Sequence, residues 1–308
     1  MSPPDGPMSP GKGPVAPCPA KTKEPTCAEL AKASDMAKLS AHTYDTNAPL
    51  PPGYTYLDPT TPAGQQKLAA IGIKPDDLSP AKSQFRAQIF QTGTDVNPSY
   101  VVAYKGTTPS SGQDWLNNTE QSVGANSDYY KQAITLGTKI DNAESGQVSF
   151  TGHSLGGGLA SAASAATNEP AITFNAAGLN PATVENYMTT DFNQATSDIT
   201  AYHVSGEMLD MVQEHPYLAG MVGGGALGSL AAPITGPAGP IIGALLLPGI
   251  KAIRGDKFLP VAAGQHITLP AVPPPGTSLA NRYNPVSRHG MDWVENGIKA
   301  KQHELGCP

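Results

Sequence analysis

The chain has 308 residues, of which 39% are hydrophobic and 14% are charged, and these proportions suit a globular protein with a buried core. Its formal net charge is -6 at pH 7 and it has no basic stripe to neutralise phosphates, which argues against nucleic acid as a principal partner. The 33 glycines and 31 prolines predict many loops and turns.

The N-terminal residues 1–27 are predicted to be a flexible leader. They are rich in proline and glycine and lack the continuous apolar core of a cleavable signal peptide. We therefore expect a protein that is cytoplasmic before export and is secreted or delivered without such a signal. The cysteines, Cys18, Cys27 and Cys307, lie only near the chain ends. Their placement leaves open a bridge from Cys307 to Cys18 or Cys27, or free thiols, and no Cys/His cluster indicates a metal or cofactor.

The folded domain is expected over residues 28–308, and it opens with a helix, because apolar residues recur at helical spacing after Cys27. A second helix is expected from Gln65 to Ile71. Two short apolar runs, Phe85 to Phe90 and Tyr100 to Tyr104, are separated by the turn-rich TGTDVNPS. They predict adjacent strands of a hairpin.

An alternation of helices and strands follows. The pattern predicts a helix from Ser127 to Asn142, a strand from Gln147 to Thr151 that leads into a small-residue helix, and further strands at Ala171 to Phe174 and Ile199 to Val204. This alternation is typical of an α/β fold with a mostly parallel central sheet.

A long apolar segment, residues 216–250, contains no charged residue. It is long enough to cross a bilayer, but Pro233, Pro237 and Pro240 interrupt it and many glycines dilute its hydrophobicity. We interpret it as an inserted pair of short, buried or lid-like helices around a Gly/Pro turn. Membrane insertion is the alternative.

The stretch TGHSLGGGLA, residues 151–160, contains the pattern G-x-S-x-G around Ser154. In a chain this rich in glycine the pentapeptide alone arises easily by chance. Its neighbours give it weight, because the reactive serine of this motif sits in a strained turn between a strand and a helix, and both are predicted here. The sequence therefore predicts that Ser154 is a nucleophile.

A serine nucleophile needs a histidine to accept its proton and a carboxylate to orient that histidine, and on this fold they follow in the order serine, acid, histidine. Glu207 comes directly after the strand that ends at Val204, and Asp210 lies one turn further on. Strand-end geometry favours Glu207, and Asp210 stays open.

Four histidines follow these acids, at positions 215, 266, 289 and 303. His289 stands in a loop just before the helix expected from Met291 to Ile298, which is the position such a base requires. His266 is the next choice, although it lies in a predicted strand. For the oxyanion hole we expect the backbone amides of Leu155 and Thr107, and the Thr107 hydroxyl is a further candidate donor.

The segments VVAYKGT (Val101 to Thr107), Asp114-Trp115-Leu116 and TGHSLGGGLA together resemble the class 3, fungal-type lipase family. The resemblance implies an α/β-hydrolase fold and lipid-ester hydrolysis, with Ser154 as nucleophile and Leu155 and Thr107 in the oxyanion hole. One departure concerns the lid, which in that family precedes the nucleophile, whereas the apolar insertion here lies between acid and histidine.

The leader, the missing signal and the apolar insertion are also similar in layout to bacterial lipase effectors delivered by type VI secretion. That similarity implies a phospholipid substrate, action at a membrane surface, an immunity protein and a secretion-machine carrier. We thus expect a serine lipase or phospholipase. A membrane-inserting toxin acting through residues 216–250, and a peptidase or thioesterase with the same catalytic groups, are the alternatives.

Overall fold

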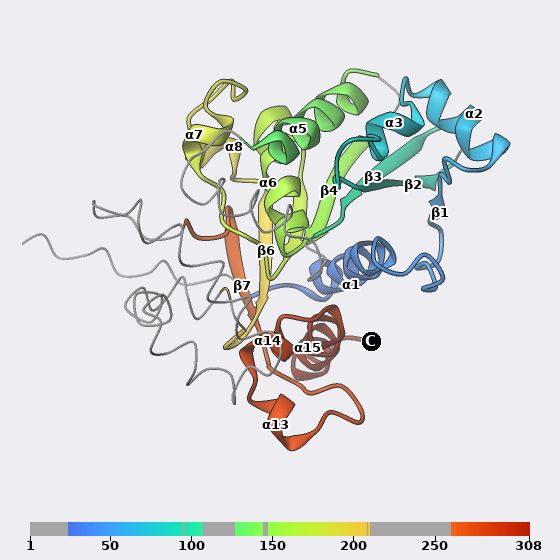
Figure 1. The fold of residues 1–308 in the computed structure, drawn as a ribbon. Coiled ribbons are helices and arrows are strands. Elements are labelled where there is room, and N and C mark those ends of the chain that lie inside the picture. Colours follow the sequence, from blue (N-terminus) through green and yellow to red (C-terminus); the bar gives the residue numbers. More distant parts are fainter. Residues whose placement is uncertain (1–23, 95, 107–126, 144–146, 208, 210–259) are drawn as a thin grey trace, which may run out of the picture.

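The computed structural model describes residues 24–94, 96–106, 127–143, 147–207, 209 and 260–308 (Figure 1). The predicted apolar insertion, residues 216–250, and most of the predicted leader lie outside the described residues. The described chain forms a seven-stranded sheet in the order β1-β2-β3-β4-β5-β6-β7. Its strands are β1 (Thr55–Tyr56), β2 (Ala87–Gly93), β3 (Pro98–Tyr104), β4 (Gln147–His153), β5 (Ala171–Phe174), β6 (Ile199–Val204) and β7 (Gln265–Leu269).

The first three strands pair antiparallel, and β3 to β7 pair parallel. The predicted hairpin is therefore confirmed as β2 and β3, and the mostly parallel sheet is confirmed as well. The first hairpin strand is shifted, because Phe85 is buried against the ring of Tyr129 outside the ladder and pairing starts at Ala87. The two residues of β1 were missed because they lie in a proline-rich loop too short to show alternation.

Helices cover both faces of the sheet (Figure 1). On one face lie α1 (Cys27–His42) and α15 (Met291–Glu304), and on the other lie α5 (Asp128–Asp141) and α6 (Leu155–Thr167). Shorter helices occur at the edges and in loops: α2 (Pro62–Ala70), α3 (Pro75–Leu78), α7 (Pro181–Val184), α8 (Phe192–Ala195), α13 (Leu279–Arg282) and α14 (Pro285–Arg288). This three-layer arrangement around a mostly parallel sheet is the predicted α/β-hydrolase fold.

The central strands are buried on both sides. Side chains of successive strand residues point to opposite faces, so Val102 and Tyr104 join the core under α5 and α6, while Val101 and Ala103 join the core under α1 and α15. A strand buried on both faces reads as a continuous apolar run, which is what YVVAY shows. The sheet is thereby fixed between two helical layers, and the carboxyl ends of its strands position the site.

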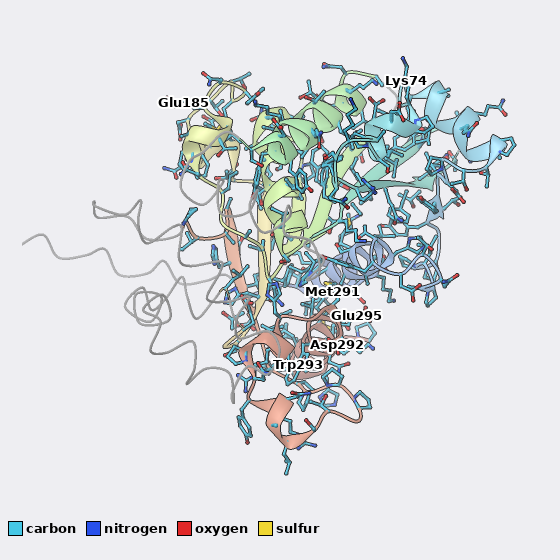
Figure 2. All side chains as sticks on the ribbon, in the orientation of Figure 1. Lys74, Glu185, Met291, Asp292, Trp293 and Glu295 are labelled. Carbon is cyan, nitrogen blue, oxygen red and sulfur yellow. A yellow bond between two sulfur atoms is a disulfide. The ribbon has the colours of Figure 1, made fainter. Side chains whose placement is uncertain are left out.

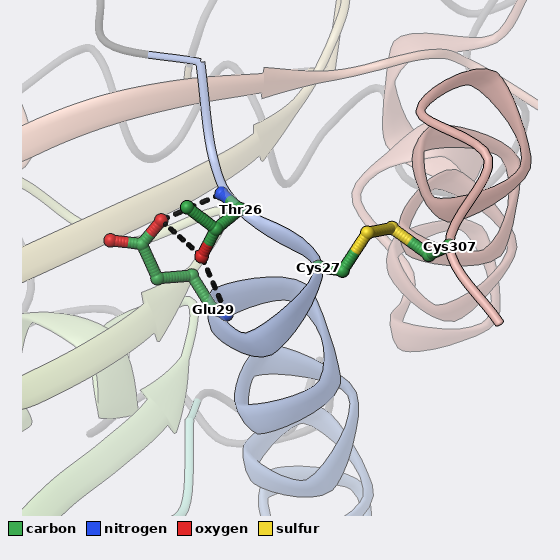
Figure 3. The surroundings of a disulfide bond; sticks show 4 residues. All are labelled: Thr26, Cys27, Glu29 and Cys307. Atoms are coloured by element: carbon green, nitrogen blue, oxygen red, sulfur yellow. Dashed lines mark hydrogen bonds between the residues drawn. A yellow bond between two sulfur atoms is a disulfide. The ribbon is translucent and has the colours of Figure 1, made fainter.

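A disulfide joins the two ends of the described chain. Cys27 is the first residue of α1, and Cys307 follows α15; their sulfur atoms are bonded (Figure 3). Beside it, Thr26 caps α1: its Oγ1 accepts from the Glu29 amide at 3.2 Å, and its own amide donates to the Glu29 carboxylate at 2.7 Å. Of the pairings left open by the sequence, the structure has Cys27 with Cys307; Cys18 lies outside the described residues.

The folded structure includes the last residues of the predicted leader. Glu24 forms an ion pair with Lys301 of α15 at 2.5 Å, next to the Thr26 cap and the Cys27 disulfide. The division into a leader and a hydrolase domain otherwise remains a prediction.

Removal of the disulfide by Cys307→Ser should lower the free energy of unfolding by about 2–5 kcal/mol, because the bond closes a loop across 280 positions of the sequence and so restricts the unfolded chain. Urea unfolding of the oxidised protein measures the loss. The matched control is dithiothreitol, which should destabilise the wild type to the same extent and leave the variant unchanged. Equal midpoints of oxidised wild type and variant would refute this role.

Candidate active site

Ser154 occupies the turn between β4 and α6. The strand runs to His153, two residues beyond the predicted end, and Ser154 then takes φ 59° and ψ -128°, a conformation that non-glycine residues rarely adopt. Backbone hydrogen bonds fix it there: its amide donates to Phe174 O at 3.1 Å, and its carbonyl accepts from the amides of Gly157 and Ala177, both at 3.0 Å. The strained turn expected of G-x-S-x-G is present.

The glycines flanking the serine are required by close approach of the backbone. A Cβ on Gly156 would lie 2.1 Å from the carbonyl oxygen of Tyr104 in β3, and a Cβ on Gly152 would lie 2.2 Å from that of Gly156. Any larger residue would push α6 away from the strands. The buried, small-residue sequence of α6 serves the same contact.

His289 and Glu207 meet Ser154 at the carboxyl edge of the sheet. The His289 Nε2 atom lies 2.9 Å from Ser154 Oγ, and its Nδ1 atom lies 2.5 Å from Glu207 Oε2. Glu207 is 1% exposed, and its Oε2 also accepts from the Leu209 amide at 2.9 Å. Because a carboxylate only accepts, the proton of the neutral ring sits on Nδ1, and Nε2 is left to accept the serine proton.

Parallel pairing explains why these residues converge. Ser154 follows β4, Glu207 follows β6 after a short turn, and both strands end at the same edge of the sheet. His289 lies in the connection from β7 to α15, and the Ser205 amide donates to Leu269 O at 3.0 Å, which joins the ends of β6 and β7. The order serine, acid, histidine along the chain thus becomes one contiguous set of side chains.

The structure does not place the other predicted catalytic residues beside Ser154. Asp210 and Thr107 lie outside the described residues, as does His215. His266 lies on β7, and its Nε2 donates a hydrogen bond to the Ala262 carbonyl oxygen at 2.7 Å. His303 is exposed near the end of α15.

Two backbone positions beside Ser154 bear on the predicted oxyanion hole. Leu155 is the first residue of α6, so its amide is one of the four N–H groups that have no acceptor within the helix. Gly106, the residue before Thr107, packs against the serine: a Cβ built on it would lie 3.2 Å from Ser154 Cβ. The chain leading to Thr107 therefore reaches the nucleophile.

Sequence reasoning missed a group of residues behind His289. His153 Nε2 lies 2.6 Å from the His289 carbonyl oxygen, and Asn175 Nδ2 donates to the same oxygen at 3.0 Å. A carbonyl only accepts, so His153 carries its proton on Nε2, and its Nδ1 accepts from the Tyr44 hydroxyl at 3.1 Å. Asn175 is itself held, because its Oδ1 accepts from the Val204 amide at 2.9 Å.

These two hydrogen bonds hold the carbonyl group of His289. No pattern in the sequence pointed to them, since His153 fills the variable position of G-x-S-x-G and Asn175 simply follows β5. The positive φ of Asn175, 42°, suits a residue type that tolerates this region, but it became visible only in the structure.

Burial and, to a smaller extent, the neighbouring His289 ring lower the pKa of His153 from 6.5 to about 3. The His153 ring, which lies beside His289, is therefore neutral near pH 7. Because the unfolded chain binds a proton at this side chain below pH 6.5 and the folded chain does not until about pH 3, His153 destabilises the fold progressively as the pH falls through that window.

Replacement of His153 by Asn should therefore flatten the decline in the free energy of unfolding between about pH 6.5 and pH 3. At pH 7.5 the same variant should be less stable than wild type, by roughly 1–3 kcal/mol, since a buried hydrogen bond to the His289 carbonyl is altered. Urea unfolding at several pH values measures both effects. An unchanged slope with pH would show that His153 does not carry this dependence.

Among the described residues, no group of three or more histidine, cysteine or acidic side chains is arranged to hold a metal ion. Within the same part of the chain, no helix combines the length and the hydrophobicity needed to span a membrane.

Residues 35–248 match the family model of the Tle-like phospholipase domain, a phospholipase-like family. The chain belongs to this family. The match includes Ser154 and Glu207 and ends before His289, so the structure adds the histidine to the residues that the Tle-like phospholipase match contains.

Two further similarities accompany the family match. Over 184 residues the chain is 33% identical to a protein of Serratia liquefaciens named extracellular phospholipase A1, covering 58% of this chain and 54% of that protein. This chain therefore spans about half the length of that relative. A fungal lipase solved in an inhibitor complex, described as a model for interfacial activation, is 16% identical with a TM-score of 0.37, covering 63% of this chain and 78% of the lipase. That similarity is too low to bear on the site.

Proposed function

We propose that the protein hydrolyses lipid carboxylic esters, as a lipase or phospholipase, through an acyl-enzyme on Ser154. The observation that carries the proposal is the His289 ring, which lies between the hydroxyl of a strained serine at 2.9 Å and a buried glutamate at 2.5 Å. A serine hydroxyl is a weak nucleophile alone, and this arrangement supplies the base and the orienting acid that it needs.

In the proposed reaction, Ser154 Oγ attacks the ester carbonyl carbon as its proton passes to His289 Nε2. Glu207 stabilises the resulting imidazolium through Nδ1–H. The carbonyl oxygen becomes an anion, which the amides of Leu155 and, as predicted, Thr107 would bind. His289 then returns the proton to the departing alcohol oxygen. A water molecule, deprotonated by the same ring, attacks the acyl-enzyme, the bond between Ser154 Oγ and the acyl group breaks, the fatty acid leaves, and the proton returns from His289 to Ser154 Oγ.

Phospholipid is the proposed substrate class. Membership of a phospholipase-like family supports it, as does the similarity to a protein named for phospholipase A1 activity. The apolar residues 216–250 would contribute an acyl-chain pocket or an interface-binding flap, which remains a prediction from sequence.

An exported protein fits this activity. The disulfide between Cys27 and Cys307 suits an oxidising compartment, and the Serratia relative is named as extracellular. We further propose delivery as an antibacterial effector, with an immunity protein and a secretion-machine carrier as partners. This proposal rests on the layout of leader and insertion in the sequence.

Ser154→Ala should lower hydrolysis of phospholipid and of a soluble short-chain ester by about 10⁴-fold or more, because it removes the hydroxyl that lies 2.9 Å from His289 Nε2. Mass spectrometry of a mixed lipid extract, before and after incubation, identifies which lipids lose fatty acid. Circular dichroism of the variant checks that the fold is kept. Full activity of a folded Ser154→Ala protein would refute the mechanism.

Glu207→Gln should lower kcat by about 10²–10⁴-fold, because an amide cannot stabilise the imidazolium and also permits the wrong tautomer. Asp210→Asn is the matched control, since it removes the other acid that the sequence offers, and it should retain activity near that of wild type. The reverse result would assign the acid to Asp210.

A membrane-inserting toxin predicts a different outcome in the same experiments. Dye release from vesicles would then survive Ser154→Ala and be lost on deletion of residues 216–250. Under the proposed function, dye release should follow ester hydrolysis and disappear with the serine.

A further inference from the structure

The connection from β7 to His289 presents two exposed apolar side chains at the catalytic edge of the sheet. Because β7 runs parallel to β4, its C-terminal end lies at the same edge as Ser154. Figure 1 shows α13 projecting beyond the end of β7, below α14 and α15 in the view. Leu279 of α13 is 75% exposed, and Tyr283, its C-cap residue, is 78% exposed.

Leu279 and Tyr283 lie four residues apart on one helical turn, so their side chains share a face. The other large apolar side chains that the described chain exposes are scattered singly over other elements. A tyrosine combines an apolar ring with a polar tip and is suited to the boundary between hydrocarbon and water. A leucine and a tyrosine side by side therefore form a small apolar surface with interfacial character.

The segment that carries this surface has no acidic residue, although the protein as a whole has a net charge of -6. No acidic residue occurs between Asp256 and Asp292, and the exposed Arg282 lies between Leu279 and Tyr283 in the sequence. Anionic lipid head groups attract such a cation near the membrane surface. The charge of this segment is thus complementary to an anionic bilayer.

The exposed turn is held by Arg288. Its Nε and Nη2 atoms donate to the Arg282 carbonyl at 3.1 and 3.0 Å, and its Nη1 atom donates to Ser205 O at 3.2 Å. The guanidinium also lies 5.9 Å from the ring centre of Trp293, at the start of α15, where Figure 2 labels Met291, Asp292, Trp293 and Glu295. One side chain therefore ties the turn to the end of β6, next to the Glu207 turn.

We propose that Leu279, Arg282 and Tyr283 form a docking tip for the surface of a bilayer that contains anionic phospholipid. Leu279 and Tyr283 enter the interfacial layer, and Arg282 contacts the head groups. The tip brings the sheet edge that carries Ser154 to the membrane. This inference deepens the proposed function, on which it rests for the lipid substrate, and it assigns the contact to the described residues rather than to residues 216–250.

The test uses the full chain with Ser154→Ala, so that lipid is not consumed, and vesicles of phosphatidylethanolamine with phosphatidylglycerol. Sedimentation of bound protein should show that Leu279→Asp with Tyr283→Asp weakens binding about tenfold or more, since two apolar contacts are lost and two negative charges gained. The matched control is Val96→Asp. Val96 is 96% exposed in the β2–β3 turn, at the opposite edge of the sheet, and its replacement should leave binding unchanged.

A second variant, Arg282→Glu, separates charge from apolar contact. It should weaken binding to the phosphatidylglycerol vesicles and leave binding to vesicles of phosphatidylcholine alone nearly unchanged. When Ser154 is left intact, the variant with both Leu279→Asp and Tyr283→Asp should hydrolyse a soluble short-chain ester at the wild-type rate. That result verifies that the variant is folded. The single variants Leu279→Ser and Tyr283→Ser should each show part of the loss of binding.

Binding equal to wild type in the double variant, or an equal loss in Val96→Asp, would overturn the docking tip. A tip that binds a protein partner would give the first of these results. Failure of the proposed function gives a different pattern, in which Ser154→Ala keeps ester hydrolysis while the effect of the tip on vesicle binding is still measurable.

Discussion

The hydrogen bond between His289 and the buried Glu207 is the constraint on which the site depends. His289 lies 135 positions from Ser154 and 82 from Glu207 in the sequence, and its ring reaches both. The backbone that carries this ring is held in place, since His153 and Asn175 both donate hydrogen bonds to the His289 carbonyl oxygen. Loss of that anchoring would separate the base from the nucleophile without touching either side chain.

The backbone of Ser154 is likewise fixed by its surroundings. Ser154 keeps its strained backbone because β5 binds its amide and the start of α6 binds its carbonyl, and α6 approaches only because glycines line the contact with the strands. Such strain persists where the surrounding structure over-determines it. The disulfide extends the constraint outward, since it joins the start of α1 to the residues after α15. Tyr44, just after α1, donates a hydrogen bond to His153, and α15 begins just after His289.

Local patterns predicted the parts of the fold that depend on local sequence. The strands before Ser154 and before Glu207, the helix after His289 and the small-residue helix α6 all follow from periodicity and strand-end position. The partner of Cys307 could not be chosen from spacing, and β1 was too short to show a pattern. His153 and Asn175 were missed because their contacts join residues more than 110 positions apart, and no property of the sequence encodes such a contact locally.

We propose Ser154 as the nucleophile and His289 as the base that activates it. Mass spectrometry of the intact protein and of its peptides, after treatment with a fluorophosphonate that reacts with activated serines, tests this assignment. We expect a single adduct on the peptide that contains Ser154, formed much more slowly in His289→Asn. An adduct on another serine, or no adduct in a preparation that hydrolyses lipid, would contradict it.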